Sequence, residues 1–250
     1  MHLNDKCALV IGASSGIGAN LARRLARDGY RVAIVARRES ELSALTQEIN
    51  QRAGKDVAFY FPHDVTDYDA VPDLLDKVFE TLGGLTHVYY AAGILRTFDA
   101  EEYSFAKDRE MVEINLMGMI AWLDSVAPLF MRLKQGVIVG IGSVAGDRGR
   151  KGNPGYNTSK GAQAIYLEAL RNRLDAYNVR VITIKPGFIE TPMTAGMGNL
   201  PFMITADEAA RLILKAAETS RGTVYVPLRW KFIMWIICSI PSFIFRKLEI

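Results

Sequence analysis

Unbroken apolar runs, rather than alternating apolar and polar residues, recur from one end of the chain to the other. Strands buried on both faces have this pattern, because helices cover both sides of a parallel sheet. Amphipathic helical patterns separate the runs, and the first carries Ile17, Leu21 and Leu25. Right-handed connections through such helices produce a doubly wound sheet. We therefore predict an α/β, Rossmann-type fold, with parallel strands at residues 7–11, 32–36, 57–61, 88–90, 137–141, 179–184 and 224–226 and helices that include 42–49 and 71–82.

The chain of 250 residues is long enough for one domain of this type and leaves little room for another. No linker, internal repeat or low-complexity segment interrupts the sequence. We predict a single Rossmann-type domain over residues 1–228, followed by a hydrophobic and basic helical tail over residues 229–250.

Charge and cysteine content exclude several functions. Basic and acidic residues number 30 and 27, and a net charge of +3 is too small to indicate a nucleic-acid partner. Cys7 and Cys238 have no metal-ligand spacing and form no disulfide framework, so we predict no metal site and a reducing compartment. The first residues lack the charged start and long apolar run of a signal peptide, which favours the cytoplasm.

A glycine-rich turn follows the first predicted strand. Residues 12–18 read G-A-S-S-G-I-G and open the first helix. Glycine is needed where a chain turns sharply, where its backbone approaches a pyrophosphate and where a helix packs on a strand, and the free N–H groups of a helix N-terminus bind phosphate. A structural turn is the alternative, but its place between strand and helix favours dinucleotide binding. The predicted contacts are Gly12, Ser14, Ser15, Gly16, Ile17 and Gly18.

The end of the second strand distinguishes NAD from NADP. An acidic side chain there would accept hydrogen bonds from the ribose hydroxyls of NAD. Here Ala36 is followed by Arg37 and Arg38, whose charge and forked donors suit a 2′-phosphate. Two solvated surface arginines are the alternative interpretation. We predict NADP(H) as the cofactor, with Arg37 as its main phosphate contact and Arg38 as a second contact or a partner of the adenine.

Tyr156 and Lys160 lie four residues apart and would share one face of a helix. Ser143 follows the strand at 137–141, at the edge where open parallel sheets bind ligands. A ketone that accepts a hydride must also gain a proton, which a tyrosine supplies if its pKa falls from about 10 toward neutrality. A nearby lysine ammonium would favour that fall, and Ser143 would hydrogen-bond the carbonyl oxygen. With the glycine turn, these residues predict reduction of a ketone or the reverse oxidation of an alcohol.

Together these motifs resemble the short-chain dehydrogenase/reductase family over nearly the full length of the chain. The resemblance implies that Ser143, Tyr156 and Lys160 are catalytic and that Asn115 holds a proton-relay water. It also implies cofactor contacts at Asp64, Val65, Ala92, Gly93, Asn115, Tyr156, Lys160, Pro186, Gly187, Ile189 and Thr191.

Two positions depart from the family pattern. Ile11 stands where threonine is common, and Tyr90 stands where an asparagine usually forms a hydrogen bond across the sheet. Because that asparagine is normally structural, we expect its replacement to affect the fold more than the chemistry.

The tail is apolar on every face from residue 232 to residue 238, and such a helix is either buried or in contact with lipid. Basic flanks and two tryptophans suit a membrane interface, whereas packing in a subunit contact or a core is the alternative. The apolar stretch is too short to span a bilayer. We therefore predict peripheral membrane contact through residues 229–250, at the inner face of the membrane.

The basic segment after Ser143 and the ending I-P-x-x-I-F-R-K resemble a subgroup of the family that includes the reductase of decaprenylphosphoryl-2-keto-ribose, a lipid-linked sugar. This resemblance implies a polyprenyl-phosphate-linked keto-sugar as substrate. The charges of Arg148, Arg150 and Lys151 near the site suit its phosphodiester, and we predict Arg148 and Arg150 as substrate contacts. Solvent exposure of this basic segment is the alternative.

Two other functions compete with that interpretation. The enzyme would instead reduce 3-oxoacyl, steroid or other lipid ketones, or the chain would be a non-catalytic NADP-binding sensor built on the same fold. The presence of Asn115, Ser143, Tyr156 and Lys160 argues against a sensor. We also expect a homodimer or a homotetramer.

Overall fold

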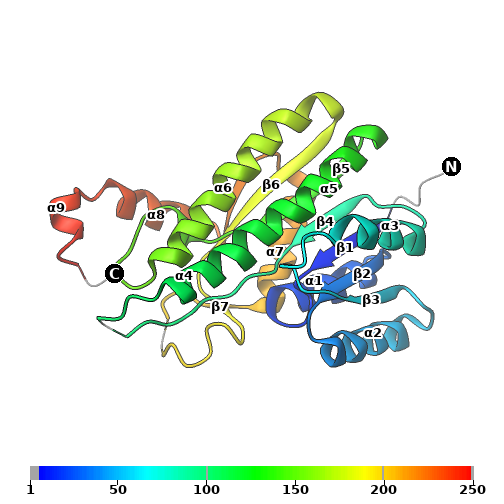
Figure 1. The fold of residues 1–250 in the computed structure, drawn as a ribbon, viewed down its shortest axis with the longest axis horizontal. Coiled ribbons are helices and arrows are strands. Elements are labelled where there is room, and N and C mark those ends of the chain that lie inside the picture. Colours follow the sequence, from blue (N-terminus) through cyan, green and yellow to red (C-terminus); the bar gives the residue numbers. More distant parts are fainter. Residues whose placement is uncertain (1–5, 100, 199, 249–250) are drawn as a thin grey trace.

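The computed structural model, shown in Figure 1, describes residues 6–99, 101–198 and 200–248. Its main element is a seven-stranded sheet with helices on both faces. The strands are β1 (Cys7–Ile11), β2 (Arg31–Ala36), β3 (Ala58–Pro62), β4 (His87–Tyr90), β5 (Gly136–Ile141), β6 (Val179–Pro186), β7 (Ile189–Glu190), β8 (Ile204–Thr205) and β9 (Thr223–Val226). The helices are α1 (Gly16–Arg27), α2 (Glu39–Ala53), α3 (Val71–Leu82), α4 (Phe105–Val112), α5 (Gly118–Leu133), α6 (Pro154–Leu174), α7 (Ala206–Thr219), α8 (Arg229–Ser239) and α9 (Ser242–Phe245), with short helical segments at Glu113–Met117, Val144–Gly146 and Asp175–Tyr177.

All strand pairs in the main sheet are parallel, in the order β3-β2-β1-β4-β5-β6-β9. The strands β2 and β3 lie on one side of β1 and the later strands of the sheet on the other, so the strand order reverses between β1 and β4. Open parallel sheets bind ligands beyond the carboxyl ends of their strands at such a reversal. Ile11, the last residue of β1, pairs with Tyr90 of β4, and the glycine turn therefore starts at this point.

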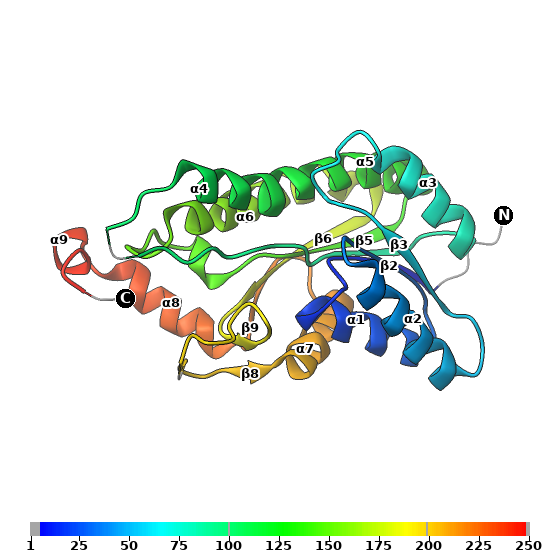
Figure 2. The same cartoon turned by 60° about the horizontal axis from the view of Figure 1, so that its bottom comes forward.

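Successive residues of each strand point to opposite faces of the sheet, and each face has its own core. Ala8 and Val10 of β1 belong to the core shared with α1, α2 and α7, whereas Leu9 and Ile11 belong to the core shared with α3, α5 and α6. Figure 2 shows these two helical layers on either side of the sheet. Because both faces are covered, both sets of side chains are apolar, which explains the unbroken apolar runs in the sequence.

A continuous helix of 29 residues runs through α4, a π-helical segment and α5. Within the described residues, it is the one helix long and apolar enough to cross a membrane, and half of its most apolar window is buried inside the protein. Met119, Trp122 and Val126 of α5 are fully buried in the core on one face of the sheet. We therefore assign the apolar face of this helix to the core.

The helices α8 and α9 extend from the end of the molecule opposite to α2 (Figures 1 and 2). Trp230 and Met234 on α8 are buried and pack with Val144 in a small separate core. The tail thus packs on the domain through one side. Ile233 and Ile237 are half-buried against the same core. Several large apolar side chains of the tail are exposed, namely Phe232, Trp235, Ile236, Phe243 and Ile244.

The predicted single-domain Rossmann-type fold is confirmed. Each of the seven predicted strands matches an observed strand to within two residues at either end, and the predicted helices lie in α1, α2 and α3. The small parallel pair of β7 and β8 was not predicted, because each strand has only two residues. The division at 228/229 stays a prediction; α8 begins at Arg229. Residues 1–5 of the predicted domain and 249–250 of the predicted tail lie outside the described residues.

Candidate active site

Two glycines of the turn after β1 leave no room for a side chain. A Cβ atom at Gly12 would lie 2.3 Å from the backbone nitrogen of Ala92, and a Cβ atom at Gly18 would lie 2.2 Å from the carbonyl oxygen of Gly12. Gly12 also has a φ of 88°, in the left-handed region that favours glycine. The turn therefore packs directly against the segment after β4. The N-cap residue Ser15 makes no side-chain cap bond, which leaves the first N–H groups of α1 for a ligand.

The two arginines after β2 have different partners. Arg38 Nη2 donates to Ser14 Oγ at 2.9 Å and to Ser15 Oγ at 3.1 Å, so Arg38 lies on the glycine turn. Arg37 Nη1 lies 3.6 Å from Asp64 Oδ2. Burial would raise the pKa of Asp64, but hydrogen bonds from Thr66 and the charge of Arg37 outweigh burial and lower it. We predicted Arg37 as the main phosphate contact, yet the structure brings Arg38 to the turn and pairs Arg37 with Asp64.

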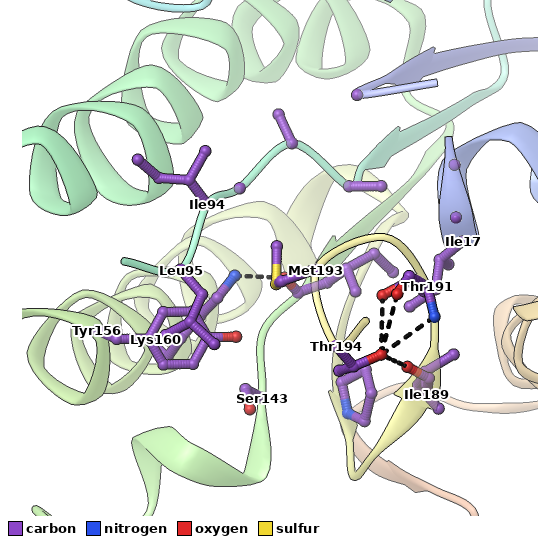
Figure 3. A pocket seen from close by; sticks show the side chains of 18 of the residues that line it. Ile17, Ile94, Leu95, Ser143, Tyr156, Lys160, Ile189, Thr191, Met193 and Thr194 are labelled. Carbon is purple, nitrogen blue, oxygen red and sulfur yellow. Dashed lines mark hydrogen bonds between the residues drawn. The ribbon is translucent and has the colours of Figure 1, made fainter. Parts of the chain in front are cut away.

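Tyr156 and Lys160 lie one turn apart near the start of α6, as predicted, and Ser143 follows β5. All three line a cleft of about 590 Å³ that also contains the glycine turn. Lys160 Nζ donates to the carbonyl oxygen of Ile141 at 3.2 Å and lies 5.7 Å from the centre of the Tyr156 ring. Figure 3 shows Ser143, Tyr156 and Lys160 gathered in one part of this cleft.

Close packing between β5 and α6 holds this group together. Ser143 Oγ accepts a hydrogen bond from the backbone nitrogen of Ala145 at 3.0 Å. A Cβ atom at Gly146 would lie 2.6 Å from the backbone nitrogen of Gly161, so the segment after Ser143 lies directly on α6. The serine therefore has a defined position beside the first turns of that helix.

The electrostatics of the group differ from what we expected for the tyrosine. Burial raises the pKa of Tyr156, and its hydrogen bond with Ser143 and the charge of Arg150 offset this only in part. Burial lowers the pKa of Lys160 to about 8. Our expectation of a lowered tyrosine pKa is wrong for the protein without ligand, because desolvation of the phenolate exceeds the stabilisation by nearby charges. Tyr156 is therefore a neutral phenol at pH 7, the form that donates a proton.

Asn115 is fully buried in the π-helical segment, behind the lysine. Its Nδ2 donates to the carbonyl oxygen of Ile94 at 3.0 Å and to Ser159 Oγ at 3.1 Å, and its Oδ1 accepts from the nitrogen of Ile94 at 2.7 Å. A Cβ atom at Gly93 would lie 3.2 Å from Asn115 Oδ1 and 3.4 Å from Lys160 Nζ. Asn115 thus joins the segment after β4 to α6. Its role in holding a relay water stays a prediction.

Tyr90, which departs from the family pattern, supports this arrangement. Its buried hydroxyl donates to the carbonyl oxygen of Ile114 at 3.0 Å, inside the π-helical segment. A Cβ atom at Gly118 would lie 2.7 Å from that hydroxyl oxygen, so the glycine makes space for the larger ring. The presence of Tyr90 instead of the usual asparagine therefore affects the segment that holds Asn115, and not the reacting groups.

The segment after β6 forms another wall of the cleft, lined by Pro186, Gly187, Ile189 and Thr191. Thr194 Oγ1 donates to the carbonyl oxygen of Ile189 at 2.7 Å and accepts from the backbone nitrogen of Thr191 at 3.1 Å (Figure 3). A Cβ atom at Gly16 would lie 3.1 Å from Thr191 Cγ2, so this wall touches the glycine turn. The residues predicted on this segment are thus brought to the cofactor side of the cleft.

The same segment contacts the tail. A Cβ atom at Gly187 would lie 1.8 Å from Trp230 Nε1, and the ring of Phe188 meets the ring of Trp230 edge to face at 5.3 Å. The indole of Trp230 therefore lies directly against the backbone of the cleft wall. The tail contributes to the shape of the site, although no motif in the tail predicts this contact.

The structure separates the two arginines that we predicted as substrate contacts. Arg148 Nη1 donates to the carbonyl oxygen of Ile237, and its guanidinium lies 3.8 Å from the centre of the Phe245 ring. Arg148 therefore holds the tail and lines a separate hollow beside α9. Arg150 lines the cleft that contains Tyr156.

Most of the residues predicted to contact the cofactor lie together in the cleft. Every predicted cofactor residue lines the cleft except Asp64, which pairs with Arg37, and Asn115, which lies behind it. Sequence reasoning missed other lining residues, because apolar or isolated polar residues there resemble ordinary core and loop positions. They include His63, Ile94, Leu95, Val144, Asn153, Phe188, Met193 and Met197.

The cleft as a whole fits a nicotinamide dinucleotide. The glycine turn gives backbone room for a pyrophosphate, and the N-terminus of α1 faces it with free N–H groups. Arg37 and Arg38 supply positive charge in the same cleft, and Tyr156 lies in that cleft as a proton donor.

Comparison with known proteins agrees with this geometry. The profile of the short chain dehydrogenase family matches residues 6–199. The chain belongs to this family. An uncharacterized oxidoreductase of Myxococcus xanthus (strain DK1622) is 36% identical over 231 residues, 92% of this chain and 90% of the relative. A trans-4-hydroxycyclohexanecarboxylate dehydrogenase of Sinomonas cyclohexanicum is 34% identical over 225 residues, 86% of each chain.

A solved structure agrees as well. A variant of actinorhodin polyketide ketoreductase with NADPH has a TM-score of 0.80 and 26% identity, and the match covers 89% of this chain and 96% of the ketoreductase. This short-chain dehydrogenase is therefore an oxidoreductase that acts on CH–OH groups with a nicotinamide dinucleotide.

Proposed function

We propose that this enzyme reduces a ketone with NADPH and that Tyr156 donates the proton. The observation that carries the proposal is the position of Arg38 on the glycine turn, in the same cleft as Tyr156 and Lys160. A guanidinium beside two hydroxyl groups forms a site for a 2′-phosphate. The two residues directly after β2, where a carboxylate would bind the ribose hydroxyls of NADH, are arginines, and the first carboxylate after β2 is that of Glu39 at the start of α2.

The protein groups have distinct tasks in this reaction. When bound, the cofactor supplies the hydride. Ser143 donates a hydrogen bond to the carbonyl oxygen and holds it toward Tyr156, which transfers its phenolic proton to that oxygen as negative charge develops. The Lys160 ammonium lies 5.7 Å from the ring and stabilises the phenolate that remains. Solvent protons return through the region of Asn115 and Lys160.

The test compares the two cofactors by titration and by turnover of a ketone. We expect NADPH to bind at least about tenfold more tightly than NADH, because charge-assisted hydrogen bonds contribute roughly 1.5–3 kcal/mol. Arg38→Ala should remove most of this preference and leave NADH binding unchanged. Arg37→Ala is the matched control and should have the smaller effect. Equal affinities for both cofactors in the wild-type protein would disprove the NADPH assignment.

The substrate class has three candidates. The relative named trans-4-hydroxycyclohexanecarboxylate dehydrogenase points to an alicyclic alcohol or ketone that carries an acidic group. A polyprenyl-phosphate-linked keto-sugar also carries an anion, and a 3-oxoacyl, steroid or other lipid ketone would occupy the apolar part of the cleft. The ketoreductase neighbour supports catalysis over a non-catalytic NADP sensor.

We also propose that the tail contacts the membrane surface. The exposed side chains of Phe232, Trp235 and Phe243 lie on the tail, with Lys231 and Arg246 also exposed. Such a surface gains both apolar burial and attraction to anionic lipid. The enzyme should sediment with anionic vesicles, and Trp235→Ser with Phe232→Ser should abolish sedimentation while NADPH binding remains. Equal sedimentation of both proteins would contradict the proposal.

For the assembly we propose a homodimer or homotetramer in the cytoplasm. Phe105 on α4 and Ile165 on α6 are 82% and 72% exposed, and Met117 between α4 and α5 is also exposed. Large apolar side chains on neighbouring helices favour a subunit contact. Light scattering of the wild-type protein and of Ile165→Asp should give an oligomer and a smaller species, respectively. A wild-type monomer would contradict it.

A further inference from the structure

Arg150 is a cation that lines the substrate cleft. No carboxylate of residues 6–99, 101–198 or 200–248 forms an ion pair with it, and its Nε atom is buried without a hydrogen-bond partner. Nη2 lies 3.8 Å from the sulfur of Met234, a weak acceptor. The carbonyl oxygen of Arg150 accepts a hydrogen bond from Asn157 Nδ2 at 3.3 Å, which fixes the residue beside the helix that carries Tyr156.

The charge of Asp147 acts on Arg150, but the Asp147 carboxylate is already paired with other residues. Asp147 forms an ion pair with Lys185 through one carboxylate oxygen and accepts from the Tyr225 hydroxyl at 2.8 Å through the other. The Asp147 side chain is only 6% exposed, so its carboxylate is enclosed by these partners. Burial lowers the pKa of Arg150, which reflects the cost of holding this charge away from water. The guanidinium nonetheless stays charged, and the half-buried Arg150 side chain leaves its buried Nε atom without a partner.

The other residues that line the cleft indicate the chemistry of the rest of the ligand. Leu95, Val144, Phe188 and Met193 also line the cleft and are apolar. Asn153, at the N-terminus of α6, lines the cleft as well, and its Oδ1 atom is buried without a partner. An apolar body with one charged end and a polar group nearby complements these walls.

We propose that Arg150 binds an anionic group of the ketone substrate, a carboxylate or a phosphate ester, and so selects acidic ketones over neutral ones. The inference rests on the proposed ketone reduction, because it assigns a role to the substrate of that reaction. It distinguishes the acidic candidates from neutral acyl, steroid and lipid ketones. Arg148, two residues away and bound to the tail, has no part in it and serves as the matched control.

A binding experiment tests the site without turnover. The NADPH complex is titrated calorimetrically with cyclohexanecarboxylate, with cyclohexyl phosphate and with neutral cyclohexanecarboxamide. We expect at least one of the two anions to bind roughly 10- to 100-fold more tightly than the amide, because a charge-assisted hydrogen bond from a desolvated guanidinium is strong. Arg150→Gln should remove this preference, and Arg150→Lys should keep part of it. The anion that binds better identifies the source of the charge.

A kinetic experiment tests whether Arg150 binds the substrate during turnover. It uses two pairs of ketones, each with an acidic and a neutral member. The first pair is 4-oxocyclohexanecarboxylate and its methyl ester, and the second is dihydroxyacetone phosphate and dihydroxyacetone. Arg150→Gln should lower kcat/KM for the acidic member of one pair by roughly 10- to 100-fold, mainly through KM. The neutral member should lose a smaller factor, through kcat, because the charge of Arg150 also acts on Tyr156. Arg148→Gln should affect both members of each pair alike, because it acts through the tail.

The outcomes separate the two proposals. If neither anion binds better than the amide, or if Arg150→Gln weakens acidic and neutral ligands equally, the anion site is wrong and Arg150 acts on Tyr156 instead. If an anion binds through Arg150 but the wild-type enzyme reduces none of the four ketones, the anion site stands and ketone reduction of these compounds has failed.

Discussion

The phosphate-binding turn and the substrate side of the cleft are assembled over different distances along the chain. At the turn, Arg38 bonds to Ser14 across 24 residues, within consecutive elements. On the substrate side, Arg150 contacts Met234 of α8 across 84 residues, and the neighbouring Arg148 bonds to Ile237 of the same helix across 89. Consecutive elements form a recognisable motif, whereas residues that meet only after folding do not. The phosphate-binding turn is therefore readable from the sequence, and substrate recognition depends on how the tail packs.

Tyr156 lies where the two sides meet, and its substitution should have the largest effect. Tyr156→Phe keeps the ring and removes the proton donor, so kcat should fall by roughly 10³-fold, within the usual range for a general acid. The Kd for NADPH should change by less than about twofold, since the ring remains. Stopped-flow measurement of hydride transfer and fluorescence titration report the two quantities. Wild-type hydride transfer in this variant would remove Tyr156 from the mechanism.

A second prediction tests whether the cofactor side depends on local backbone shape. Gly12→Ala places a methyl group 2.3 Å from the nitrogen of Ala92 at a φ of 88°, so it should lower the free energy of unfolding by more than about 2 kcal/mol and weaken NADPH binding. Gly54→Ala is the control, because Gly54 also has a positive φ of 66° but nothing within 4 Å. It should cost only about 1 kcal/mol and leave binding unchanged. Urea unfolding and NADPH titration measure both variants, and equal losses would contradict the role of close packing.

A third prediction tests the link between the tail and the cleft wall. Gly187→Ala should displace the indole of Trp230, and Trp230→Ala should leave space for the new methyl group. The double variant should therefore be more stable than the sum of the single effects predicts, by about 1–2 kcal/mol. The cycle is measured by urea unfolding. Additive effects would mean that the tail does not press on Gly187 in solution.

The smallest expected effect is a pH dependence from Lys160. Its pKa of about 8 lies below the value of about 10.4 in an unfolded chain, so its ammonium is lost above pH 8 in the folded protein. Ketone reduction should decline above that pH by up to about tenfold. The folded state binds fewer protons than the unfolded state between the two values, so the contribution of Lys160 to stability rises with pH there. Lys160→Arg keeps the charge, and any residual activity should show no decline near pH 8. A flat profile to pH 10 in the wild-type enzyme would contradict the assignment.

The sequence was sufficient to predict the sheet, because strands covered on both faces must be apolar throughout and seven such runs are present. It was also sufficient to place Tyr156 and Lys160, whose spacing within one helix survives folding, and Gly12 and Ser143, each of which follows a predicted strand. The pKa of Tyr156 was not predictable, because it depends on burial by distant segments. Arg148 and Arg150 are equivalent in the sequence, and only the packing of α8 and α9 separates them.

The contact between Trp230 and Gly187 also bears on protein synthesis. A ribosome makes the glycine turn early, whereas α8 is made after every strand of the sheet. A nascent chain that holds the glycine turn and every strand of the sheet therefore exists before the wall at Gly187 receives its indole. NADPH present during translation would stabilise that intermediate by mass action, in proportion to its free concentration relative to its Kd. The completed substrate pocket would then form around a cofactor already in place.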